Sequence, residues 1–302
     1  MKRVSIISGF TDEVSDDLGV QIKALKELGW SCVDLRTVDG KNVSTLTDDE
    51  FDRIHDQLGE HGITIACFGS TVANWGRDPI NDFDTDLAEM KRSVRHMGRA
   101  AVRSIRIMSY RVAEPVPLGN EIESRILFNI GELVKIAEDN GVICLHENCQ
   151  TWGGQSPLHS LRLLEAVDSP ALRLIFDTGN PVSMKDVRGE APYRLQDALD
   201  FYHQVKAYVD YIHIKDAVVE DGRARYVFPG EGHARVREIL ADVARHKTGI
   251  PISIEPHVSV VFHDPSVQAP FEERWKNFIS CGRLLVEMAA QAGIVLNVNK
   301  QP

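Results

Sequence analysis

The sequence predicts a single (β/α)8 barrel, a TIM barrel of the α/β class, that occupies the whole chain, residues 1–302. Short apolar runs rich in β-branched residues recur eight times, and segments of helical periodicity follow them. The runs are apolar almost without interruption, which is typical of strands buried on both faces of a parallel sheet. No linker rich in Pro, Gly or Ser separates the units, and this favours one closed barrel.

The predicted strands are distributed along the entire chain. They lie at Val4–Ser8, Cys32–Leu35, Thr64–Phe68, Ser104–Met108, Val142–His146, Leu172–Phe176, Tyr211–Ile214 and Ile252–Glu255. The alternative fold is an open doubly wound sheet, which usually carries a G-x-G-x-x-G turn after its first strand. The stretch Ser8–Thr11 does not supply that turn.

Start and stop signals mark the helices between the strands. Thr47–Glu50 forms a capping box ahead of an apolar stripe that Gly62 closes. Ser156–Pro157 places a cap and then a proline at the first helical position. Further apolar stripes precede Gly29 and lie at Ile126–Ala137, Val236–Val243 and Phe278–Met288.

The composition excludes several classes of protein. Hydrophobic residues make up 43% and charged residues 26%, as in ordinary globular proteins. A net charge of −10 disfavours nucleic acid and anionic membranes, so we expect a small-molecule partner. Five scattered cysteines without a C-x-x-C pair indicate reduced thiols. Without a recognisable signal peptide or membrane span, we expect a cytoplasmic location. The oligomeric state stays open, with a homo-oligomer among the alternatives.

Strands five to eight each end in an acid or a histidine, namely Glu147, Asp177, His213 and Glu255. Because parallel strands of a closed barrel meet around one opening, these side chains should converge where such barrels hold their active sites. Three carboxylates and one imidazole suit one divalent ion, Mn²⁺ first, with Mg²⁺, Co²⁺ or Zn²⁺ as alternatives. The absence of thiolates argues against a structural zinc site.

Two other motifs carry weaker signals. His146–Gln150 begins like the zinc-protease motif H-E-x-x-H, but it ends in Gln and belongs to a strand end. Pro229–Gly232 is either a phosphate-binding loop or a tight turn, and Glu231 at its centre would repel an anion.

On these residues the chain resembles the xylose-isomerase-like barrel superfamily. That superfamily includes ketose 3-epimerases, hydroxypyruvate isomerase, inosose dehydratase and an AP-endonuclease branch that repairs DNA. The resemblance spans nearly the whole length and is most specific at His146–Glu147, Phe176–Gly179, Ile212–Asp216, Pro229–Gly232 and Ile254–Glu255, with further matches at Gly9–Glu13, Leu28–Arg36 and Gly69–Ser70. It implies that Glu147, Asp177, His213 and Glu255 bind the metal.

The chain departs from the family at one position. The family's usual Asp-x-Gly-His after strand six is Asp177–Asn180 in this chain, so Asn180 stands where a histidine would contact substrate. Asparagine can hydrogen-bond a hydroxyl, but it cannot shuttle a proton. The departure leaves room for a relative that handles a different keto sugar or eliminates a leaving group.

The leading hypothesis is a metal-dependent sugar isomerase or epimerase that works through an enediolate. Glu147 and Glu255 would act as base and acid on the two faces of the reacting carbon. A keto-sugar dehydratase or keto-glycoside lyase on the same site is the alternative. The expected substrate contacts are Arg36, Trp75, Arg106, Trp152, Asn180, Lys215 and His257.

Two further classes are less favoured. A DNA-repair nuclease would need about three metals and extra histidines, yet Gly69–Ser70 and Asn180 stand where that branch places histidine. A silent sugar-binding barrel would not need all four ligands. No cluster of Lys or Arg stands out as a phosphate clamp, which favours an unphosphorylated substrate.

Overall fold

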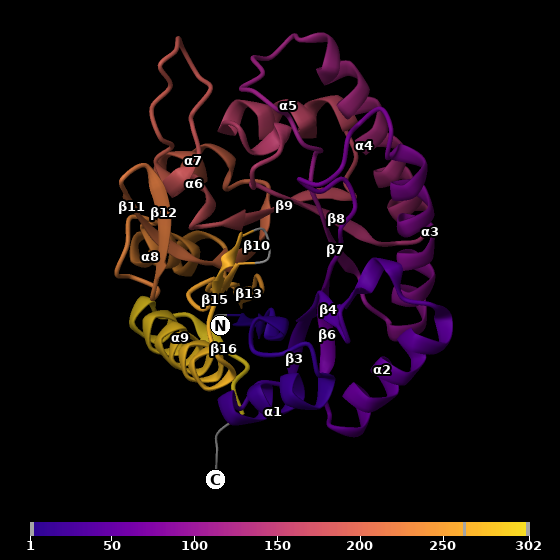
Figure 1. Cartoon of the computed structure of the whole chain (residues 1–302), viewed down its shortest axis with the longest axis vertical. Coiled ribbons are helices and arrows are strands. Elements are labelled where there is room, and N and C mark those ends of the chain that lie inside the picture. The colour runs from indigo at the N-terminus through magenta and orange to yellow at the C-terminus, as the bar shows by residue number, and fades with distance from the viewer. Residues whose placement is uncertain (1–2, 262–263, 300–302) are drawn as a thin grey trace.

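The computed structural model describes residues 3–261 and 264–299. Eight parallel strands form a ring, with helices around its outside (Figure 1). The strands are hydrogen-bonded in the order β2-β13-β10-β9-β8-β7-β6-β3. Between the two end strands, Ser8 Oγ donates a hydrogen bond of 2.8 Å to Asp34 Oδ1. The predicted barrel is confirmed, and the open sheet is excluded.

The barrel strands match the eight predicted runs, with one exception. They are β2 (Ile7–Gly9), β3 (Cys32–Leu35), β6 (Thr64–Gly69), β7 (Ser104–Ile107), β8 (Ile143–Glu147), β9 (Leu172–Asp177), β10 (Val209–Ile214) and β13 (Ile252–Ile254). The first predicted strand, Val4–Ser8, is divided. Its beginning, β1 (Val4–Ser5), pairs outside the barrel with β16 (Val295–Leu296) near the other end of the chain.

Helices cover the outer surface of the ring, as Figure 1 shows. They are α1 (Leu18–Leu28), α2 (Asp48–Glu60), α3 (Phe83–Ala100), α4 (Glu121–Asp139), α5 (Pro157–Val167), α7 (Ala198–Val205), α8 (Val236–His246) and α9 (Phe271–Ala292). The short helix α6 (Asn180–Ser183) lies at the barrel mouth. The predicted capping box exists: Thr47 Oγ1 accepts from Glu50 N, and Thr47 N donates to Glu50 Oε2. Gly29 ends α1 at φ +68°, a conformation that glycine adopts without strain. No helix within the described residues is long and apolar enough to cross a bilayer.

Side chains alternate along each strand, and this alternation divides the barrel interior into layers. Cys67, Leu145, Ile175 and Tyr211 form a small apolar cluster of their own, separate from the larger core. The larger core includes the apolar faces of the surrounding helices. The interior below the mouth is therefore packed with side chains, as is usual for this fold.

Loops and hairpins after the strands raise the wall of the barrel mouth. They include β4 (Thr37–Val38) with β5 (Lys41–Asn42), β11 (Asp216–Glu220) with β12 (Arg223–Val227), β14 (Val260–Val261) with β15 (Asp264–Gln268), and the 3₁₀ turns η1 (Thr11–Glu13), η2 (Val43–Thr45) and η3 (Trp152–Gly154). Loops after the strands supply most of the residues around the site described next.

Candidate metal centre and active site

The four predicted ligands lie one layer above the apolar cluster of the barrel. Glu147 and Asp177 each follow a residue of that cluster by two positions, so both point into the barrel at its C-terminal end. His213 does the same on β10, and Glu255 comes directly after β13. Because β13, β10, β9 and β8 are consecutive neighbours in the sheet, four adjacent strands deliver the four side chains to one place.

The geometry of this cluster is compact. One ligand atom from each of the four side chains lies within 4.8 Å of the others, and all four side chains are buried. His213 Nδ1 lies 3.4 Å from Glu147 Oε1. Lys215 Nζ lies 3.2 Å from Asp177 Oδ2 and 2.9 Å from Glu255 Oε2. The cluster therefore has the spacing of a shared coordination sphere.

The residues fit a divalent cation. Glu147 Oε2 and Asp177 Oδ2 are buried and accept no hydrogen bond from any described residue. Each oxygen has a cation nearby, Arg106 Nη1 at 3.3 Å from Glu147 Oε2 and Lys215 Nζ at 3.2 Å from Asp177 Oδ2, but no hydrogen bond, so it keeps lone pairs that a metal ion could bind. Three carboxylates and one imidazole form a hard donor set suited to Mn²⁺, Mg²⁺ or Zn²⁺.

Cationic side chains keep the two glutamates of the cluster ionised. Burial by itself would raise the pKa of Glu147, but the Arg106 guanidinium beside it lowers that pKa to about 2. Burial opposes ionisation of Glu255 as well, yet Lys215, His257 and Arg36 hold its pKa well below the usual range. Both carboxylates are therefore negatively charged at neutral pH and can accept a proton.

The other two ligands hold protons more firmly. Burial raises the pKa of Asp177 to about 6, although Lys215 opposes this shift. Burial would lower the pKa of His213, but Asp34 and Glu147 beside the ring raise it to about 9. A metal ion must displace the proton of His213 below about pH 9, and that of Asp177 as well below about pH 6.

We therefore expect Mn²⁺ affinity to rise with pH. Between about pH 6 and 9 one displaced proton gives roughly a tenfold gain per pH unit, and below pH 6 the slope steepens towards two protons. Chelator competition from pH 5 to 9 measures this dependence. In the His213→Gln variant, Mn²⁺ affinity should no longer rise with pH between pH 6 and 9. A flat profile in the wild type would contradict a protonated His213 in the metal-free protein.

Asp34 lies behind His213 and faces its ring. Asp34 Oδ1 accepts hydrogen bonds from Ser8 Oγ at 2.8 Å and Tyr211 Oη at 2.6 Å. Asp34 Oδ2 lies 3.6 Å from His213 Nε2. A carboxylate behind a histidine favours a proton on the nearer ring nitrogen, so Nδ1 of His213 would be the nitrogen available to a metal.

Replacing Asp34 by asparagine is expected to weaken Mn²⁺ binding about 10- to 100-fold, because the amide cannot favour one tautomer of His213 in the same way. Calorimetric titration of the metal-free protein with Mn²⁺ measures the loss. Asp86→Asn removes another fully buried carboxylate, one on α3. Unchanged affinity in Asp34→Asn, or an equal loss in Asp86→Asn, would refute a positioning role for Asp34.

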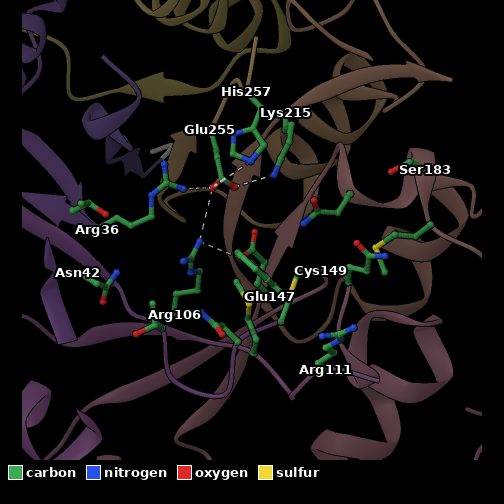
Figure 2. Close-up of a pocket in the computed structure, with 18 of the residues that line it drawn as sticks. Arg36, Asn42, Arg106, Arg111, Glu147, Cys149, Ser183, Lys215, Glu255 and His257 are labelled. Carbon is green, nitrogen blue, oxygen red and sulfur yellow. Dashed lines mark hydrogen bonds and ion pairs between the residues drawn. The ribbon is translucent and has the colours of Figure 1, made fainter. Parts of the chain in front are cut away.

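A cavity of about 620 Å³ opens above the cluster. Glu147 and Glu255 form part of its wall, and Figure 2 shows them on either side of the Arg106 guanidinium. Six of the seven expected substrate contacts also line it: Arg36, Trp75, Arg106, Asn180, Lys215 and His257. The structure therefore brings residues from both halves of the sequence to one opening.

Trp152 lies elsewhere. Its side chain is fully buried, belongs to the hydrophobic core and packs edge-on against His159. The turn η3 that carries it is packed tightly, since a Cβ on Gly153 would lie 2.6 Å from His146 Cε1. Because the indole is enclosed by the core and is not part of the cavity wall, we do not retain Trp152 as a substrate contact.

Two of the contacts are held by buried networks. Arg36 donates to both carboxylate oxygens of Asp12, at 2.8 and 2.9 Å, and also to Glu255. His257 has φ +56°, its backbone N donates to Glu13 Oε2, and its Nδ1 lies 2.9 Å from Glu13 Oε1. The imidazole is thus fixed with Nε2 on the side of Glu255, at 3.9 Å from Oε1.

Sequence reasoning missed three residues of this site. Glu13 holds His257, Asp34 faces His213, and Tyr226 lines the cavity with its ring edge-on to His257. The acid Asp34 between Val33 and Leu35 was a usable signal, because a charge inside an apolar strand needs a partner. Glu13 and Tyr226 lie on local turns and hairpins and carry no comparable signal.

The two weaker motifs have structural roles. His146 is buried on the strand, lies 3.0 Å from Ser109 Oγ, and is not part of the ligand cluster. The Pro229–Gly232 turn wraps around Asp216, whose carboxylate accepts from the backbone N–H groups of Gly230, Gly232 and Ala234. These N–H groups already bind a carboxylate, so the turn has no such donors left for a phosphate.

Comparisons with known proteins agree on the fold. The solved structures that match include a xylose isomerase domain protein from Planctomyces limnophilus, with 18% identity, TM-score 0.71, and coverage of 97% of this chain and 99% of that one. The IOLI protein with a bound zinc atom gives 16% identity, TM-score 0.70, and coverage of 97% and 99%. A D-allulose 3-epimerase from Methylomonas sp. in complex with D-allulose gives 15% identity, TM-score 0.66, and coverage of 95% and 98%. A search of curated proteins finds no match.

The sequence itself carries the family assignment. The profile described as xylose isomerase-like TIM barrel matches residues 22–267, which include all four residues of the ligand cluster. With this match and the ring of eight parallel strands, the chain belongs to the xylose isomerase-like TIM barrel family.

Proposed function

We propose that this protein is a divalent-metal-dependent isomerase or epimerase of a keto sugar. The observation that carries the proposal is the buried cluster of Glu147, Asp177, His213 and Glu255 at the floor of an open cavity. Solved structures of the same fold include epimerases of ketoses, among them the D-allulose 3-epimerase and an L-ribulose 3-epimerase. These neighbours support the reaction class, and the cluster supports the use of a metal.

The four residues of the cluster would hold one metal ion, with Mn²⁺ as our first choice. When bound, such an ion supplies Lewis-acid stabilisation of negative charge on the oxygens of a sugar substrate. Structures of the same fold contain magnesium or zinc, which agrees with a site for a divalent cation. Arg106 and Lys215 add positive charge on the cavity side of the cluster.

In this proposal Glu147 and Glu255 move a proton on opposite sides of a substrate carbon. Arg106 Nη1 lies 3.3 Å from Glu147 Oε2 and 3.8 Å from Glu255 Oε1, so the two carboxylates flank one guanidinium (Figure 2). In our proposal one carboxylate removes the proton next to the carbonyl and later releases it to water. The other carboxylate takes up a proton from water and gives it to the opposite face or the adjacent carbon. The first outcome is epimerisation and the second is isomerisation.

Neighbouring side chains would orient the sugar for this transfer. Lys215, Asn180 and His257 all line the cavity and can hydrogen-bond hydroxyl groups. The backbone N–H of Asn180 donates to Asp177 Oδ1 at 2.7 Å, which fixes the start of α6 beside the cluster. Asn180 would therefore contact a hydroxyl without taking its proton.

Hydrogen exchange with solvent tests the proposal. The Mn²⁺-loaded protein is incubated in D₂O with D-fructose, D-allulose or L-ribulose, and NMR follows deuterium at the carbons beside the carbonyl. We expect deuterium to enter at least one sugar, together with a new epimer or isomer. A new unsaturated product would instead assign elimination, as in a dehydratase or lyase. No exchange with any keto sugar, while the protein holds its metal, would overturn the proposal.

A further inference from the structure

The cavity is larger than one sugar needs. Its volume of about 620 Å³ lies in the range that encloses drug-sized ligands. It equals the volume of about twenty water molecules, at roughly 30 Å³ each. A hexose, with only about a dozen non-hydrogen atoms, would occupy a minor part of this space. The cavity therefore has room for a second group beside a sugar at the ligand cluster.

The loops after β6 and β7 form one side of the cavity wall. Trp75 lies on the first of these loops, and Met108 and Arg111 lie on the second. Backbone hydrogen bonds join the two loops: Met108 N donates to Val72 O at 3.2 Å, and Arg111 N donates to Arg77 O at 3.0 Å. The two loops thus form one continuous wall, next to the strand that carries Glu147.

This wall differs in chemistry from the region around the ligands. Near the cluster the cavity is lined by charged groups, among them Glu147, Glu255 and Lys215. The loops after β6 and β7 contribute Trp75, Met108, Val112 and Ala113 to the lining, beside the polar Thr71 and Asn74. Trp75 is 42% exposed, and aromatic and thioether side chains pack well against planar rings.

Arg111 adds a cation to the same wall. Its side chain is exposed at the cavity, and no carboxylate of the described residues lies within ion-pairing distance of its guanidinium. Figure 2 places Arg111 on the side of the cavity away from Glu255 and His257. A planar guanidinium stacks on aromatic rings and donates hydrogen bonds to their oxygen substituents.

We propose that the site takes a two-part substrate, in which a sugar at the ligand cluster is joined to an aromatic ring against the wall of Trp75 and Arg111. The inference rests on the proposed function, because the sugar half is held by the metal-binding cluster. It extends that function by naming an aryl-substituted sugar as the substrate class. Apolar contact along the wall would add affinity that a free monosaccharide lacks.

A matched set of probes tests the second subsite. Calorimetry of the Mn²⁺-loaded protein compares methyl β-D-glucoside, phenyl β-D-glucoside and cellobiose, with D-fructose as the free-sugar reference. The two simple glucosides differ only in the group beyond the sugar. We expect the phenyl glucoside to bind at least about tenfold more tightly than the methyl glucoside. We expect cellobiose, whose second ring is hydroxylated, to gain less.

Two variants test whether Trp75 is responsible for the tighter binding of the phenyl glucoside. Trp75→Ala should reduce the preference for the phenyl group to about threefold or less. Phe128→Ala removes another exposed aromatic ring, one on α4 that is 56% exposed and does not line the cavity, and it should keep the full preference.

The outcomes separate this inference from the proposed function. Equal binding of the two glucosides, binding of D-fructose alone, or a gain with cellobiose as large as with the phenyl group would overturn the aromatic subsite and leave the metal-dependent reaction intact. A phenyl preference that survives in Trp75→Ala would also overturn it. Failure of every sugar, D-fructose included, would count against the proposed function and the inference together.

Discussion

Replacing Glu147 by glutamine is expected to lower the rate of substrate hydrogen exchange by about 10³-fold or more. The amide cannot accept the proton next to the carbonyl, and general base catalysis contributes roughly 10²- to 10⁴-fold to such reactions. Glutamine is nearly isosteric and keeps one oxygen that can face the metal. The effect should therefore fall on kcat, while substrate affinity measured by calorimetry changes little.

The measurement combines exchange in D₂O with metal analysis of the same sample. Saturating Mn²⁺ separates loss of the base from loss of the ion, since Glu147 serves both roles in the proposal. Glu132→Gln, an exposed substitution on α4, controls for the change of charge. If the exchange rate of fully metal-loaded Glu147→Gln falls by less than about tenfold, another group removes the proton.

Replacing His213 by alanine is expected to remove the metal. Structural metal sites in proteins bind with roughly 10 kcal/mol or more shared among about four ligands, so the loss of one ligand should weaken binding about 10²- to 10³-fold. His213 is fully buried and contributes the one nitrogen of the cluster. We expect about one Mn²⁺ per wild-type chain by elemental mass spectrometry and close to none in His213→Ala after gel filtration.

A neighbouring histidine provides the control for this measurement. His146 is buried one position before Glu147 but belongs to no ligand cluster of the described residues, so His146→Ala should retain the metal. About three zinc ions per wild-type chain would instead support the nuclease that the sequence disfavours. No metal in a refilled wild-type sample would refute the mechanism proposed for Glu147 and Glu255.

The ligand cluster could be predicted from sequence because two regularities place it. Strand side chains alternate with a period of two, and parallel strands of a barrel end at one opening. A polar residue at the end of each apolar run therefore had to point to a common place. The positions of Glu147, Asp177 and His213 relative to Leu145, Ile175 and Tyr211 follow this rule directly.

The supporting residues depend on contacts between distant parts of the chain. Glu13 reaches His257 across 244 positions, and Arg36 reaches Glu255 across 219. The first predicted strand was divided because β16, near the other end of the chain, pairs with Val4–Ser5. Local periodicity contains no information about which remote segment will supply a partner.

The two tryptophans expected at the site illustrate this limit. Trp75 and Trp152 both lie in loops beyond strand ends, so the sequence predicts the same role for both of them. In the folded chain Trp75 is 42% exposed in the cavity wall, whereas Trp152 is fully buried against His159. The sequence by itself determined the barrel and the four residues that gather at its mouth, because strand periodicity and closure are local and repeated. Only the tertiary structure decided which loop side chains face the cavity, because that choice depends on how each loop packs against its neighbours.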